Sequence, residues 1–154
     1  MANPLKMLKL KSTLLQIIQE VPINAPPAKV WKALMKSGWF GLGKDAATSP
    51  KALVEPRIGG RYAMERPDGS ESRLLGFISH IEPNKLLRVY GPGVMTHLPT
   101  SSTLIFELQP GKTGKTTLLR FCERTYGMMT PDAKKSHTGG WKVQLGKLKA
   151  LAEK

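Results

Sequence analysis

A Gly-Lys-Thr triplet, which could bind a phosphate group, occurs twice in PGKTGKTTLL, residues 110–119. A phosphate-binding loop needs glycine, four residues and then Gly-Lys-Ser/Thr, so that backbone N–H groups surround a phosphate and the lysine reaches its outer oxygens. The two triplets would require glycine where the sequence has Gln109 and Phe106. A helix should also follow the loop, whereas TTLLRFCERTY has the composition of a strand. We therefore expect a Gly-rich hairpin turn between two strands.

Histidine and cysteine are the next candidates, as metal ligands or nucleophiles. His80, His97 and His137 each lie more than five residues from one another and from Cys122, so they form no sequence-level metal motif. We predict no metal and no cofactor. His137 is expected to precede the helix that carries Trp141 and to be a surface or capping residue. Cys122 is expected to be an inert thiol, because a nucleophile needs a neighbouring base.

Two strands flank the predicted turn, and their alternation indicates which side chains face inward. Successive residues of a strand point to opposite faces of a sheet. In the second strand, Arg120 and Arg124 belong to the polar face, so the Phe-bearing face is the better inward choice. The predicted inward residues are Leu104, Phe106 and Leu108 in the first strand and Leu119, Phe121 and Glu123 in the second.

Glu123 is the best candidate for a catalytic or ligand-binding group. A carboxylate placed beside Phe121 and Met64 would be desolvated, which suits a general acid or base or a hydrogen bond to a ligand. The alternative is a structural carboxylate at the rim of a cavity, paired with arginine or water. Tyr62 offers a hydroxyl group, or it is only part of the wall.

The elements that must position these residues follow a simple order. Thr13–Asn24 predicts a strand, and AKVWKALMK after Pro27 predicts a helix, because proline suits the first helical position. SGWFGLGKD, residues 37–45, predicts a short helix or compact turn. Short alternating segments separated by turn signals such as Pro67-Asp68-Gly69 then indicate an antiparallel meander.

The C-terminal segment predicts a long amphipathic helix. Trp141, Leu145, Leu148 and Ala152 recur at helical spacing, with Leu151 at the edge of the stripe. The sequence allows two starts for this helix, with either Thr130 or Ser136 as the N-cap residue. Gly139 and Gly140 lower the helix propensity of its first turns. The predicted fold class is α+β, with this helix lying across the sheet.

Composition restricts the class of protein further. The chain has 154 residues, a formal net charge of +13 and a single cysteine. No apolar segment approaches the roughly 18 residues of a membrane-spanning helix, and the N-terminus lacks the pattern of a signal peptide. We expect a cytoplasmic protein, monomer or homodimer, with residues 1–12 as a flexible basic tail and 13–154 as one domain. The charge is spread over both halves without a motif, so we expect no specific nucleic acid.

Five segments in order resemble a known family. These are APPAKVWKALMKSGWF, EPRIGGRYAMERPDGSE, GFISHIEPNKLL, STLIFELQP and GGWKVQLGKLKAL. They are similar to the START-like (SRPBCC) superfamily, in its branch of homologues of the activator of heat-shock-protein-90 ATPase. The resemblance implies a helix-grip fold, in which a curved antiparallel sheet wraps around the C-terminal helix and leaves a cavity.

The resemblance also implies a function: binding of a small hydrophobic or amphipathic molecule, such as a lipid, in that cavity. Two alternatives stay open. One is a cofactor-independent polyketide cyclase or hydrolase that uses Glu123, and the other is a module that stimulates a chaperone ATPase, as in a stress response. The residues predicted to bind the ligand are Tyr62, Met64, Leu104, Phe106, Leu119, Phe121, Glu123 and Trp141.

Overall fold

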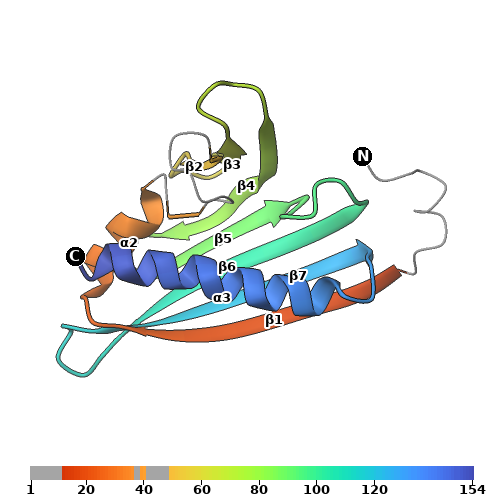
Figure 1. Cartoon of the computed structure of the whole chain (residues 1–154). Coiled ribbons are helices and arrows are strands. Elements are labelled where there is room, and N and C mark those ends of the chain that lie inside the picture. Colours follow the sequence, from red (N-terminus) through yellow and green to blue (C-terminus); the bar gives the residue numbers. More distant parts are fainter. Residues whose placement is uncertain (1–11, 37–38, 41–48) are drawn as a thin grey trace.

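The computed structural model describes residues 12–36, 39–40 and 49–154 (Figure 1). Residues 1–11 of the expected basic tail and most of the turn expected at residues 37–45 lie outside these ranges, whereas Ser12 begins a strand. The elements are β1 (Ser12–Ile23), α2 (Pro27–Met35), β2 (Lys51–Val54), β3 (Arg61–Glu65), β4 (Ser72–Glu82), β5 (Leu86–Gly91), β6 (Thr100–Pro110), β7 (Thr117–Met128) and α3 (Ala133–Ala152).

One antiparallel sheet of seven strands carries the fold, in the order β1-β7-β6-β5-β4-β3-β2. β2 to β7 form the predicted meander, and β1 closes the sheet against β7 over the whole register from Ser12↔Met128 to Ile23↔Thr117. Figure 1 shows the curved sheet with α3 lying across one face and α2 near the C-terminal end of α3. The predicted α+β class and the helix-grip arrangement are confirmed.

The β6–β7 hairpin places two alternating strands side by side. Phe106 pairs with Phe121 and Leu104 pairs with Glu123 in its register. All four side chains are buried, whereas Arg120 and Arg124 are exposed on the other face, as the alternation predicted.

The segment that contains the Gly-Lys-Thr repeat is the turn of this hairpin. Gly114 has φ +70°, a left-handed conformation that favours glycine. The N–H group of Gly114 donates to the carbonyl of Gly111, and the N–H group of Gly111 donates to the carbonyl of Thr116. A strand follows this turn, so the structure bears out a hairpin and not a phosphate-binding loop.

The C-terminal helix α3 packs its predicted stripe against the sheet. Trp141, Leu145, Leu148 and Ala152 are buried, and Leu151 is half-buried at the edge. The helix begins at Ala133, after Asp132, and no side chain caps this end. Gly139 and Gly140 lie inside the helix, not at its start, which places His137 in its second turn.

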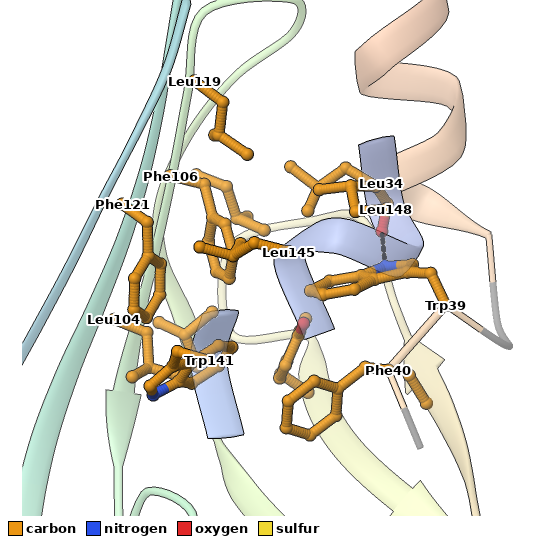
Figure 2. Packing of buried hydrophobic residues seen from close by; sticks show 14 of the residues in the cluster. Leu34, Trp39, Phe40, Leu104, Phe106, Leu119, Phe121, Trp141, Leu145 and Leu148 are labelled. Carbon is orange, nitrogen blue, oxygen red and sulfur yellow. Dashed lines mark hydrogen bonds between the residues drawn. The ribbon is translucent and has the colours of Figure 1, made fainter. Parts of the chain in front are cut away.

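Aromatic side chains fill the space between the sheet and α3 (Figure 2). The ring centroids of Phe106 and Phe121 lie 5.1 Å apart, and those of Phe121 and Trp141 lie 4.2 Å apart. Trp39 packs against Phe106 in the same core, and its indole N–H donates to the carbonyl of Leu34 at 3.1 Å. This packed core fixes α3 over β6 and β7.

Candidate functional site

A cavity of about 200 Å³ lies between the first half of α3 and the β3–β4 part of the sheet. Its lining combines apolar and polar side chains from Phe40, β3, β4, the loop after β5 and α3. The lining residues are Phe40, Met64, Arg73, Leu75, Val94, Ser136, His137, Gly140, Trp141 and Gln144.

The apolar wall is aromatic on one side and aliphatic on the other. The rings of Phe40 and Trp141 are stacked at 5.2 Å, with an angle of 29° between their planes. Met64 and Leu75 lie opposite, on neighbouring strands of the sheet, and both are buried. Such a wall can hold an apolar ring or a short chain by burying its surface.

The polar part of the lining consists of Arg73, Ser136, His137 and Gln144. Arg73 is a half-exposed cation on β4, and its Nε donates to Glu71 Oε1 at 2.5 Å. Ser136, His137 and Gln144 come from α3. A few converging polar groups in an otherwise apolar cavity are typical of sites for small molecules.

Glu123 lies behind this cavity, at the centre of a buried hydrogen-bond network. Its side chain is fully buried. Trp141 Nε1–H donates to Oε2 at 2.5 Å, and the Thr125 hydroxyl donates to Oε1 at 2.8 Å. The Ser102 hydroxyl lies 2.5 Å from that of Thr125 and completes the chain. These donors suit the acceptor-only, ionised form of a carboxylate.

His137 also faces Glu123, which corrects the prediction of a surface or capping residue. Its Nδ1 lies 3.2 Å from each carboxylate oxygen, and only 12% of its side chain is exposed. The prediction was wrong because it placed the helix start too late. With α3 beginning at Ala133, His137 is one turn before Trp141 and shares its face.

The other predicted ligand-binding residues fall into two groups. Met64 and Trp141 line the cavity, whereas Glu123 reaches it only through Trp141 and His137. The remaining five are packed in the hydrophobic core outside the lining of this cavity. They are Tyr62, Leu104, Phe106, Leu119 and Phe121.

Tyr62 is the unusual member of that core group. Its hydroxyl group is buried and has no hydrogen-bond partner within the described part of the chain. Burial raises the pKa of Tyr62. The ring packs 6.5 Å from that of Phe106.

Several lining residues were missed by reasoning from the sequence. His137 and Gln144 could have been found from their spacing to Trp141, four residues before and three residues after. Arg73 and Val94 carry no such signal, because their position depends on how β4 and the loop after β5 curve over the helix.

The remaining chemical candidates lie away from the cavity. His80 Nε2 pairs with Glu82 at 3.0 Å on the surface, His97 is exposed, and Cys122 is half-buried. Within residues 12–36, 39–40 and 49–154, no group of three His, Cys, Asp or Glu side chains could hold a metal ion. No helix in the same ranges is long and apolar enough to cross a membrane.

A curved sheet, a long C-terminal helix and a cavity between them define the class: a helix-grip domain of the START-like type. The family model described as "Activator of Hsp90 ATPase homolog 1-like protein" matches residues 24–153. The chain therefore belongs to this SRPBCC-type family, as the five segments indicated. Membership places it in a ligand-binding fold.

Solved structures share the fold over nearly their whole length. Protein CV1439 from Chromobacterium violaceum is 20% identical, with a TM-score of 0.70 over 90% of this chain and 97% of that one. Protein MLL2253 from Mesorhizobium loti is 26% identical, with a TM-score of 0.62 over 88% and 95%. CalU16 from Micromonospora echinospora is 22% identical, with a TM-score of 0.62 over 92% and 85%. No curated protein matches the chain.

Proposed function

We propose that this protein binds a small hydrophobic or amphipathic molecule in the cavity between α3 and the sheet. The observation that carries the proposal is the lining itself: a stacked Phe40–Trp141 pair faces Met64 and Leu75, with a few polar groups at one side. Polar side chains in an otherwise apolar cavity are typical of sites that bind small molecules.

The size of the cavity indicates how much of a ligand it can take up. An engineered apolar cavity of roughly 150 Å³ takes up benzene, so about 200 Å³ can hold a single substituted ring or a short branched chain. The driving force is burial of apolar surface, about 25 cal/mol per Å² before the cost of lost ligand freedom.

An enzymatic role is the second candidate, and the His137–Glu123 pair favours it. The Glu123 side chain has no exposed surface and contacts the cavity-lining residues His137 and Trp141. A cyclase or hydrolase that used this cavity would present His137 to its substrate, with Glu123 as the positioning residue behind it.

The binding proposal is tested by filling the cavity from α3. Gly140 lines the cavity, and a Cβ added there meets no atom within 4 Å. Gly139 also has open space but is not part of the lining. Gly140→Leu and Gly139→Leu are therefore a matched pair, since both gain helix propensity of about 0.8–1 kcal/mol.

The ligand probe is para-nitroanisole, a neutral single-ring molecule, titrated by calorimetry. We expect saturable binding to the wild-type protein and to Gly139→Leu, and at least about tenfold weaker binding to Gly140→Leu, because the leucine occupies the space of the ring. Equal binding by all three proteins, or none by the wild type, would overturn the proposal.

A further inference from the structure

The polar group that the cavity offers a ligand can be identified from the hydrogen bonds around Glu123. Trp141, Thr125 and His137 surround its two oxygens, and its side chain has no exposed surface. A ligand in the cavity therefore cannot reach the carboxylate. His137 and Trp141 both contact Glu123 and line the cavity. The single N–H group of the Trp141 indole is already donated to Glu123, so His137 is the one of the two with a second polar atom.

The orientation of the imidazole assigns a role to each ring nitrogen. Nδ1 is directed at the carboxylate, so in the neutral ring it carries the hydrogen and donates it to Glu123. Nε2 then keeps its lone pair, and no hydrogen-bond partner for it is found within the described part of the chain. Nε2 of His137 is thus an acceptor in the cavity lining, in a ring that the buried Glu123 carboxylate orients from its other side.

The charges around His137 favour a ligand that can give up a proton. Glu123 on β7 would face an imidazolium formed by protonation of Nε2. Arg73 on β4 lines the same cavity, and no acidic side chain belongs to the described lining. The other charged groups near His137 on its own helix are the exposed Lys134 and Lys135. An anion beside Nε2 would lie near His137 and Arg73, of which Arg73 is also paired with Glu71 and His137 with Glu123 on the other side of its ring.

We propose that the ligand is a small weak organic acid, a phenol or carboxylic acid on an apolar body, whose acidic hydroxyl binds to Nε2 of His137. This inference rests on the proposed binding function and adds the chemical class of the ligand. On binding, the ligand O–H bond breaks and its proton moves to Nε2. The ligand anion then lies against an imidazolium that Glu123 holds from the other side.

The test uses para-nitrophenol, whose phenol and phenolate forms absorb at different wavelengths, and para-nitroanisole, its methyl ether without an acidic proton. Both are titrated at a pH at which the free nitrophenol is mainly protonated. In the wild-type protein we expect nitrophenol to bind at least about tenfold more tightly than the ether, and to show the phenolate spectrum when bound.

His137→Asn is the informative variant, because an asparagine amide can still donate to Glu123 in place of Nδ1 but has no group in place of Nε2. We expect it to lose the preference for nitrophenol over the ether and to leave bound nitrophenol in its phenol form. His80→Asn is the control, since it removes a surface imidazole that is also paired with a glutamate. It should behave as the wild type.

Each result separates the inference from the function on which it rests. If both dyes bind equally well to the wild type and to His137→Asn, the cavity binds ligands but His137 does not select acids. The inference about weak acids is then wrong, whereas the proposed binding function stands. A phenolate spectrum that persists in His137→Asn has the same consequence. If neither dye binds to the folded wild-type protein, the proposed function falls as well.

Discussion

Nδ1 of His137 lies 3.2 Å from both carboxylate oxygens of Glu123, which joins α3 to β7 through a buried ionisable pair. Trp141, one turn further along the helix, donates to the same carboxylate. The pair lies at the back of the cavity, where burial strengthens each hydrogen bond and makes an unpaired group costly. Stability and ligand binding therefore depend on the same few atoms.

The indole of Trp141 should contribute more to stability than that of Trp39. Both rings are buried, but Trp141 donates to a carboxylate and Trp39 to a backbone carbonyl. A hydrogen bond to a charged group is worth about 1.5–3 kcal/mol and one to a neutral group about 0.5–1.5 kcal/mol. Trp141→Phe should therefore lower the free energy of unfolding by more than Trp39→Phe, as measured in urea. The reverse order would contradict an ionised Glu123.

Replacement of two glycines by alanine should have opposite effects. A Cβ at Gly146, on the exposed side of α3, meets no atom within 4 Å, so Gly146→Ala should stabilise the protein by about 1 kcal/mol. A Cβ at Gly76 would lie 2.5 Å from the backbone oxygen of Tyr90, where β4 pairs with β5. Gly76→Ala should destabilise it by about 1–3 kcal/mol. Thermal unfolding of both variants checks the two signs together.

The Glu55–Arg61 pair should make stability depend on pH in acid. Hydrogen bonds from the Arg61 side chain and backbone lower the pKa of Glu55 from 4.5 to about 2. Because the folded-state pKa is depressed, the stabilisation is present above the ordinary value of 4.5 and is lost as the pH falls toward about 2.

Arg61→Gln tests this dependence. The substitution should return the pKa of Glu55 toward 4.5, as followed by NMR titration of its side chain. It should also lower the urea midpoint at pH 6, and this difference should shrink toward pH 2, where Glu55 is about half protonated in the wild-type protein and almost fully protonated in the variant. A pKa of Glu55 that does not move would show that Arg61 is not the cause.

Tyr62→Phe should leave ligand binding unchanged and should not destabilise the protein. The Tyr62 hydroxyl is buried without a partner in the described part of the chain, and Tyr62 is not among the lining residues of the cavity. An unsatisfied buried hydroxyl costs about 1–3 kcal/mol, so its removal should be neutral or stabilising. If Tyr62→Phe instead weakens binding of para-nitroanisole, the hydroxyl reaches the ligand, as the sequence had suggested.

Local patterns in the sequence predicted much of this structure. Alternation in β6 and β7 identified the inward residues, including Glu123, because one face of the hairpin is buried and the other carries arginine. The stripe from Trp141 to Ala152 predicted the face that α3 buries. The five family segments predicted how these elements assemble.

The composition of the site was less predictable because it depends on contacts between distant elements. His137 escaped notice because Gly139 and Gly140 suggested a later helix start, whereas packing of α3 on the sheet outweighs their low helix propensity. Glu123 has its partners on β7 and α3, so its burial behind the cavity follows from the crossing of helix and strand. No spacing within one segment encodes that crossing.

The central claim, a ligand site between α3 and the sheet, is tested most directly by locating a bound probe by NMR. Intermolecular NOEs would be measured between the methyl group of para-nitroanisole and the assigned side chains of the wild-type protein. The account predicts NOEs to the methyl groups of Met64, Leu75 and Val94 and to the indole of Trp141. NOEs only to exposed apolar residues on the outer face of the sheet, such as Leu14 and Tyr126, would contradict it.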